Sequence, residues 1–169
     1  MKKIWYVAFL MVCALMATSC SSDDDDDVDE AWKEANRVAL LAVTGDSNYT
    51  AIKSQSDAGS IYVKKIRNGS GTERILYNTN VKIHYKGSYY DGTVFDNSHE
   101  SIYKDPITAP ANNYIDGFTT ALQWMTEGDY WEVWIPYQLG YGTGGYDPIP
   151  GYSNLKFEIE IVEIMDKPQ

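Results

Sequence analysis

This sequence has few of the histidines and cysteines that bind transition metals or act as nucleophiles. The only histidines are His84 and His99, and the only cysteines are Cys13 and Cys20. These residues do not stand at the spacings typical of metal ligands, and there is no Gly-x-Ser-x-Gly nucleophile motif. We therefore expect no metal, no other cofactor and no nucleophilic catalysis of the serine-hydrolase kind.

A run of glycines from Gly140 to Gly145 has the spacing of a dinucleotide-binding loop. A phosphate site of that kind needs a helix that begins directly after the glycines. Asp147, Pro148 and Pro150 argue against such a helix. We interpret the run as a glycine-hinged flap instead.

Aromatic side chains are abundant, with 14 Tyr, 5 Trp and 4 Phe in 169 residues. Rings in such numbers suggest an aromatic-lined core or a binding surface. Because the formal net charge is -10, the chain lacks the cations that neutralise phosphates, and no nucleic acid is expected as a partner. A glycan-binding surface stays open, and it would require exposed, coplanar rings at Trp131, Trp134, Tyr89, Tyr90 and Tyr152.

The N-terminus has the pattern of an export signal. Residues 1–19 begin with a methionine and two lysines and continue as an apolar run, which predicts a cleaved signal peptide. The stretch Leu15 to Cys20 resembles a bacterial lipobox, so Cys20 is expected to become the lipidated first residue. Acyl chains would anchor the domain, because each buried methylene contributes about 0.8 kcal/mol. An ordinary signal beside an unpaired cysteine is the alternative.

Residues 20–27 contain five consecutive aspartates, Asp23 to Asp27. Like charges repel one another, so we expect an extended tether. A cysteine followed by serine and acidic residues also resembles the surface-export signal of some Gram-negative lipoproteins, and a plain solvated spacer is the alternative. The expected location is the bacterial cell envelope, lipid-anchored in the outer membrane, on its periplasmic or its surface face.

Residues 28–59 are expected to form an N-terminal helix and a linker. Asp29 could cap a helix that ends at about Val43, and Gly45 would stop it. One face of this helix would carry Trp32, Ala35, Ala39 and Val43. We expect that face to dock on its own domain, with a dimer contact as the alternative. The mostly polar segment Gly45 to Gly59 reads as a linker, so the folded domain would span residues 60–169.

From Ser60 onward the hydrophobic pattern has a period of two, which predicts strands. The clearest alternations lie at residues 81–85, 131–135 and 155–161. Asp91-Gly92 predicts a hairpin turn. Apolar residues from Ile115 to Met125 recur at helical spacing, and Gly128 would end that helix. Strands outnumber helices without a strand-helix-strand rhythm, so the expected fold class is α+β.

Five short motifs also carry a resemblance to a known family. They are Val-Lys-Ile-His-Tyr-Lys-Gly at 81–87, Asp-Gly-Thr-Val-Phe-Asp-Asn-Ser at 91–98, Tyr-Ile-Asp-Gly-Phe at 114–118, Leu-Gly-Tyr-Gly at 139–142 and Ile-Pro at 149–150. In this order they resemble the pocket motifs of the FKBP family of peptidyl-prolyl cis/trans isomerases. The resemblance implies a curved antiparallel β-sheet wrapped over one central α-helix, here with an extra N-terminal helix. It also implies isomerase activity on proline-containing unfolded or exported polypeptides, no cofactor, and binding of macrolide-type inhibitors.

Carried over position by position, the resemblance implies a concave apolar site for a proline ring. Its members would be Tyr85, Phe95, Asp96, Ile115, Phe118, Tyr141, Ile149 and Phe157. Rotation about an X–Pro bond breaks an amide resonance that sets a barrier of about 18–20 kcal/mol. The twisted amide is less dipolar than the planar one, so a dry aromatic site favours the twisted state. Asp96 would orient polar groups at the rim, because a carboxylate beside Phe95 is costly unless it is hydrogen-bonded.

The resemblance also implies a role for the other members. Phe118 would form the floor of the site, and Phe95 and Phe157 would form its walls. The N–H of Ile115 and the hydroxyl of Tyr141 would hold substrate carbonyl groups.

The chain departs from the family pattern at four positions. Phe118 stands where the commonest member has Trp, and Ala109 stands where Phe is frequent. Tyr114 is bulkier than the usual Val, and Pro148 replaces an aliphatic residue. These changes would reduce activity or shift the preference for the residue before proline. Two alternatives stay open: a non-catalytic proline-segment binding or chaperone module of the same fold, and the glycan-binding lipoprotein.

Overall fold

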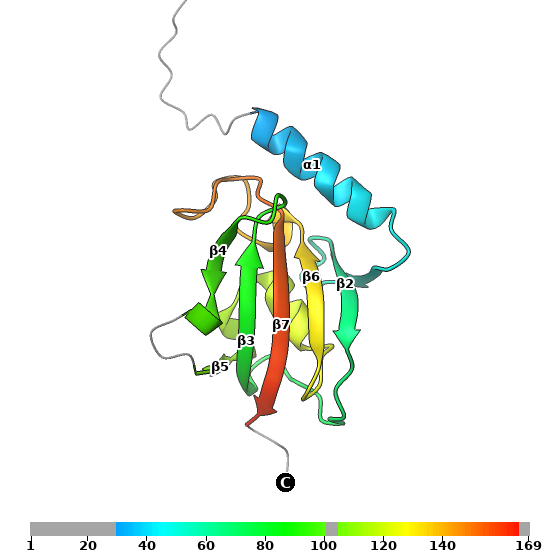
Figure 1. Cartoon of the computed structure of the whole chain (residues 1–169), viewed down its shortest axis with the longest axis vertical. Helices are drawn as coiled ribbons and strands as arrows, with labels where there is room; N and C mark the ends of the chain where they lie inside the picture. Colours follow the sequence, from blue (N-terminus) through cyan, green and yellow to red (C-terminus); the bar gives the residue numbers. More distant parts are fainter. Residues whose placement is uncertain (1–29, 101–104, 166–169) are drawn as a thin grey trace, which may run out of the picture.

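The computed structural model describes residues 30–100 and 105–165. The predicted signal peptide, the lipidated Cys20, the acidic tether and the expected helix cap Asp29 all lie outside the described residues. Within the described part, an antiparallel sheet packs against one helix, and a second helix lies across the end of the sheet (Figure 1). No helix among these residues is long and apolar enough to cross a lipid bilayer.

Seven strands form the sheet. They are β1 (Thr50–Lys53), β2 (Ser60–Arg67), β3 (Asn80–Ser88), β4 (Val94–Asn97), β5 (Ile107–Pro110), β6 (Tyr130–Ile135) and β7 (Leu155–Ile164). Their order across the sheet is β1-β2-β6-β7-β3-β4, and β5 pairs with β3. Every pairing is antiparallel. The predicted α+β class, an antiparallel sheet over one helix, is confirmed.

The central strands form where the apolar residues alternate. On β7, Phe157, Ile159 and Ile161 are buried while the residues between them are partly exposed, as expected for a strand with one face on the core. The pairing of β7 with β3 places Phe157 opposite Gly87. This register fixes a large ring beside a residue without a side chain, which matters for the site described below.

Helix α2 (Asp116–Leu122) covers the apolar face of the sheet, and it is the yellow-green helix behind the strands in Figure 1. All residues from Gly117 to Leu122 are buried. Gly117 allows a close approach to β6, because a Cβ atom at this position would lie 2.3 Å from Cγ2 of Ile135. The helix is therefore pressed against the strand at the end that faces the site.

The C-terminus of α2 differs from the prediction. The helix ends at Leu122 rather than at Met125. The N–H groups of Trp124 and Met125 donate to the carbonyls of Ala121 and Leu122, three residues earlier. Such bonds tighten the chain into a 3₁₀ turn, which hydrophobic spacing alone does not distinguish from a further helical turn.

The prediction that residues 45–59 are only a linker is wrong. They contain β1, which pairs with β2 and forms one edge of the sheet. The sheet therefore begins at Thr50 instead of at Ser60. Ile52 is the only residue of β1 that is buried, so one apolar side chain among polar neighbours was too weak a periodic signal to predict a strand.

Helix α1 (Glu30–Thr44) confirms the predicted N-terminal helix. Its buried residues are Asn36 and Val43, and the ring of Trp32 packs edge-on against Tyr89 and Tyr90. The helix thus docks on its own domain, as expected. Three short 3₁₀ helices, η1 (Ser98–Glu100), η2 (Ala111–Asn113) and η3 (Tyr137–Leu139), complete the described elements.

Candidate active site

A cavity of about 440 Å³ lies between α2, β3, β4, β7 and the loop that follows η3. We call it the aromatic cavity. Its lining residues are Tyr85, Phe95, Asp96, Asn113, Tyr114, Ile115, Phe118, Tyr141, Tyr146 and Phe157. All of the predicted site residues except Ile149 are among them, although they are spread over more than seventy positions of sequence. The structure therefore brings together residues that sequence motifs had singled out separately.

Three phenylalanine rings build the apolar part of the aromatic cavity. Phe118 is almost fully buried, with 1% of its surface exposed. The ring of Phe157 stands perpendicular to that of Phe118 at a centroid distance of 5.1 Å, and to that of Phe95 at 5.7 Å. Edge-to-face packing of this kind is favourable for aromatic rings. The arrangement agrees with the expected floor and walls.

Gly87 leaves the space that these rings occupy. A Cβ atom at Gly87 would lie 2.6 Å from Cζ of Phe95 and 2.8 Å from Cε1 of Phe157. Both distances are shorter than any ordinary carbon contact. A side chain at position 87 would therefore push both wall rings out of place.

The rim of the aromatic cavity carries one charged group with a defined partner. The hydroxyl of Tyr85 donates a hydrogen bond to Oδ2 of Asp96 at 2.7 Å. Burial, and then the contact with this carboxylate, raises the pKa of Tyr85 well above its usual value. The hydroxyl therefore remains a donor at all physiological pH values, and Asp96 has the hydrogen bond that its position next to Phe95 requires.

Ser98 joins the strand that carries Phe95 and Asp96 to β3. The Ser98 hydroxyl accepts a hydrogen bond from the N–H of Tyr85 at 2.8 Å and donates one to its carbonyl at 3.0 Å. Ser98 is buried, with 1% of its surface exposed. These two hydrogen bonds were not predicted, because a serine at the end of a strand resembles any turn residue.

Tyr114 is a lining residue that the sequence motifs marked only as a departure from the family pattern. Its ring stacks on that of Phe118 at 4.6 Å with an interplanar angle of 24°. The hydroxyl is buried and has no hydrogen-bond partner among the described residues, and burial raises the pKa of Tyr114 to about 12. Its place directly before Ile115 was the signal that could have identified it.

Two donors at the aromatic cavity are not used by the fold. No hydrogen bond among the described residues uses the N–H of Ile115 or the hydroxyl of Tyr141. Burial, and then the charge of Asp96, raises the pKa of Tyr141, so its hydroxyl stays protonated. Tyr146, a flap residue that the predicted site set did not include, stacks on Tyr141 with ring centroids 5.6 Å apart. Both donors are therefore free for carbonyl groups of a ligand.

Ile149 corrects the predicted set, because it does not line the aromatic cavity. It belongs to the hydrophobic core with 7% of its surface exposed. Its N–H and carbonyl both pair with the backbone of Tyr146. Ile149 supports the loop that carries Tyr146. Ala109 and Pro148, two of the noted departures, are also absent from the lining.

Two alternative sites lose support. The glycine run is followed by turns and an isolated bridge rather than by a helix, so it lacks the helix terminus of a dinucleotide site. The rings proposed for glycan binding do not form an exposed platform, because Trp131 and Trp134 have 1% and 7% of their surfaces exposed.

Comparison with known proteins agrees with this geometry. A family model described as FKBP-type peptidyl-prolyl cis-trans isomerase matches residues 71–162. The chain belongs to this family. The match covers the strands and α2 that surround the aromatic cavity, so the resemblance drawn from five motifs is confirmed.

Individual relatives are similar to about half of this chain or somewhat more. The macrophage infectivity potentiator of Trypanosoma cruzi is 45% identical over 104 residues, which are 61% of this chain and 52% of the relative. An FKBP-type 22 kDa peptidyl-prolyl cis-trans isomerase of Escherichia coli is 43% identical over 86 residues, 50% of this chain and 41% of the relative. The chain thus spans about half the length, or less, of these relatives.

A solved structure shows the same fold. The crystal structure of a peptidyl-prolyl cis-trans isomerase from Pseudomonas syringae superposes with a TM-score of 0.69 at 26% sequence identity. The superposition covers 84% of this chain and 99% of the other. It therefore extends beyond the segment that the family model matches.

Proposed function

We propose that this protein catalyses cis/trans isomerisation of X–Pro bonds in unfolded or exported polypeptides, using the aromatic cavity. The observation that carries the proposal is the cavity itself. It combines three packed phenylalanine rings with two unused hydrogen-bond donors and a tyrosine-bonded carboxylate at its rim. Macrolide-type inhibitors of the family would compete for the same space.

The proposed mechanism needs no nucleophile. A proline ring would rest on Phe118 between Phe95 and Phe157, in a site with few competing water molecules. The amide that precedes the proline is planar and dipolar in both ground states, and its twisted transition state is less dipolar. An apolar site therefore stabilises the twisted state relative to the planar states, which is differential binding of the transition state.

The polar groups would fix the peptide on either side of the rotating bond. The N–H of Ile115 and the hydroxyl of Tyr141 would each donate to a substrate carbonyl, so one side of the bond is held while the other turns. The Tyr85–Asp96 pair would keep the rim polar and in one conformation. Immobilising the substrate near the twisted geometry removes part of the entropic cost of reaching it.

The test is acceleration of X–Pro exchange in a short Leu-Pro peptide, measured by exchange NMR or a protease-coupled assay. The wild-type protein should accelerate exchange at micromolar concentration, and Phe157→Ala should lower kcat/KM by about 100-fold, because it removes a wall of the cavity. Tyr77→Ala is the matched control, since this aromatic residue is 59% exposed and lies outside the cavity; it should change kcat/KM by less than about twofold.

Three outcomes separate the possible functions. A folded wild-type protein that binds the peptide without accelerating exchange would be the non-catalytic binding module instead. A protein that neither binds nor accelerates would contradict both. An unchanged rate in a correctly folded Phe157→Ala variant would mean that isomerisation takes place elsewhere on the molecule.

We further propose that a lipid on Cys20 tethers the domain to the outer membrane of the bacterial cell envelope through the acidic segment 20–27. The support comes from the sequence pattern of residues 1–27. Mass spectrometry of the protein isolated from membranes should show a diacylated cysteine at its N-terminus. Cys20→Ser should release the protein into the soluble fraction, and a variant that remained in the membrane fraction would contradict lipid anchoring.

A further inference from the structure

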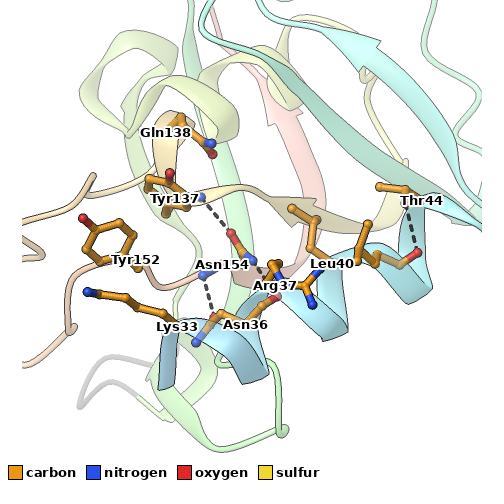
Figure 2. A pocket seen from close by; sticks show the side chains of 10 residues that line it. Lys33, Asn36, Arg37, Leu40, Thr44, Tyr137, Gln138, Tyr152 and Asn154 are labelled. Atoms are coloured by element: carbon orange, nitrogen blue, oxygen red, sulfur yellow. Dashed lines mark hydrogen bonds between the residues drawn. The ribbon is translucent and has the colours of Figure 1, made fainter. Parts of the chain in front are cut away.

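A buried hydrogen-bond network joins α1 to Asn154, which stands at the end of the loop that follows η3 and carries Tyr141 and Tyr146 (Figure 2). Asn36 has 1% of its surface exposed and Asn154 has 2%. The N–H of Asn154 donates to Oδ1 of Asn36 at 2.8 Å, and Nδ2 of Asn154 donates to the carbonyl of Asn36, also at 2.8 Å. The two residues are 118 positions apart in the sequence. The side-chain oxygen and nitrogen of both asparagines are hydrogen-bonded, and a buried pair of this kind fixes one relative position of two segments.

The same network continues to the loop that carries Tyr141. Oδ1 of Asn154 accepts a hydrogen bond from the N–H of Tyr137 at 2.9 Å, as drawn in Figure 2. The carbonyl of Tyr137 accepts from the N–H of Gly142 at 2.9 Å, and the carbonyl of Gly142 accepts from the N–H of Tyr152 at 3.0 Å. Every link from α1 to the residue next to Tyr141 is therefore a direct hydrogen bond.

A second connection runs through aromatic rings to the wall of the aromatic cavity. The ring of Trp32 on α1 lies 5.4 Å from that of Tyr89, edge-on. The ring of Tyr89 lies 5.0 Å from that of Phe95, and its hydroxyl donates to the carbonyl of Pro148 at 3.3 Å. Tyr89 thus contacts Trp32 of α1, and it also contacts Phe95 in the wall of the aromatic cavity and Pro148 in the loop that follows η3.

We propose that α1 belongs to the catalytic apparatus, with Trp32 and Asn36 as positioning residues that fix Phe95 and Tyr141 for isomerisation. The inference rests on the proposed function. Neither residue touches the aromatic cavity, so both act through others: Trp32 through Tyr89, and Asn36 through Asn154. The helix holds two sides of the cavity at once and sets the distance between them.

The proposal is tested by steady-state kinetics of the full chain at a temperature at which every variant is folded. Asn36→Ala and Trp32→Ala should each lower kcat by about tenfold and change KM by less than about threefold. The substrate should still bind, but the Tyr141 hydroxyl that donates to its carbonyl, or the ring of Phe95, would be displaced. Trp32→Phe is the conservative variant, because it keeps a ring against Tyr89, and it should recover most of the lost kcat.

Val38→Ala is the control, because Val38 is 52% exposed on the same helix and should leave kcat unchanged. Hydrogen exchange provides a readout that does not depend on activity: the Gly142 amide should exchange at least about tenfold faster in Asn36→Ala, since its partner Tyr137 loses its support. A merely structural helix would lower the unfolding midpoint without changing kcat or Gly142 exchange in the folded state, and that result would overturn the proposal.

The experiment also separates this inference from the proposed function. If the wild-type protein fails to accelerate exchange, both are lost, whatever the variants show. If the wild-type protein is active and Asn36→Ala and Trp32→Ala retain full kcat, only the role of α1 is lost.

Discussion

Two of the cavities in the described part of the molecule, each of about 440 Å³, are built differently. One is the aromatic cavity. The other, which we call the α1 groove, lies between α1 and the segments around η3 and Tyr152 (Figure 2). It is lined by Lys33, Asn36, Arg37, Leu40, Leu41, Thr44, Tyr137, Gln138, Tyr152 and Asn154. Volume therefore does not distinguish a reaction site from a gap beside a docked helix.

The polar groups mark the difference. In the α1 groove, Asn36 and Asn154 bond to each other, Lys33 pairs with Glu30, and Arg37 pairs with a glutamate one turn earlier. In the aromatic cavity, the N–H of Ile115 and the hydroxyl of Tyr141 remain unused among the described residues, and both residues line a space that packed rings border. A ligand could thus gain hydrogen bonds in the aromatic cavity, whereas in the groove it could use the amides of Asn36 and Asn154 only by breaking bonds that join α1 to the domain.

The largest expected contrast comes from adding one methyl group beside each cavity, at Gly87 next to the aromatic cavity and at Gly45 at the end of α1. Gly87→Ala should lower kcat/KM by about 50-fold and the free energy of unfolding by about 2 kcal/mol, because the rings of Phe95 and Phe157 must move. Gly45→Ala, at the end of α1, should change either quantity very little, since its Cβ would meet the carbonyl oxygens of Leu41 and Ala42 at 3.6 and 3.8 Å. Enzyme kinetics and urea unfolding measure both, and equal effects at the two glycines would contradict the contrast.

A smaller contrast concerns one hydroxyl in each place. Tyr85→Phe removes the donor to Asp96, so kcat/KM should fall by about fivefold and stability by about 1 kcal/mol. Tyr152→Phe removes a hydroxyl that bonds to no described residue and keeps the ring under Lys33. Its kinetics should match the wild type. If Tyr85→Phe also left kcat/KM unchanged, the hydrogen bond between Tyr85 and Asp96 would have no part in the reaction.

The smallest expected effect concerns Tyr114, whose buried hydroxyl lacks a partner among the described residues. Tyr114→Phe should raise the free energy of unfolding by about 1 kcal/mol at neutral pH, because an unsatisfied buried group is removed. Its kcat/KM should stay within about twofold of the wild-type value. Chemical unfolding at pH 7 measures the gain, and a clear loss of stability would show that the hydroxyl is satisfied in solution.

The pH dependence gives the same variant a second signature. A tyrosine in the unfolded chain has a pKa of about 10, and burial raises the pKa of Tyr114 to about 12 in the folded state. The folded state thus holds this proton more tightly. The resulting contribution to stability is fully present below pH of about 10 and is lost as the pH rises towards 12. Tyr114→Phe should reduce the decline of stability across that interval.

The sequence predicted the sheet best where burial alternates along a strand. The strands β3, β6 and β7 follow that alternation, and five motifs identified most of the aromatic cavity. Edge strand β1 was missed because it buries a single side chain, Ile52. Asn36 was missed because an asparagine on a helix resembles a surface residue until its partner Asn154 is known. Such pairs depend on tertiary contacts that no local pattern contains.

The most direct test of the central claim is a two-dimensional NMR titration of the wild-type protein with a Leu-Pro tetrapeptide, in which binding and peptide exchange are recorded in one sample. The amide signals of Asp96, Ile115 and Tyr141 should shift most, those of the α1 groove should shift little, and exchange between cis and trans peptide should accelerate as the cavity fills. Shifts confined to residues such as Leu41 and Thr44, or binding in the aromatic cavity without faster exchange, would contradict the account.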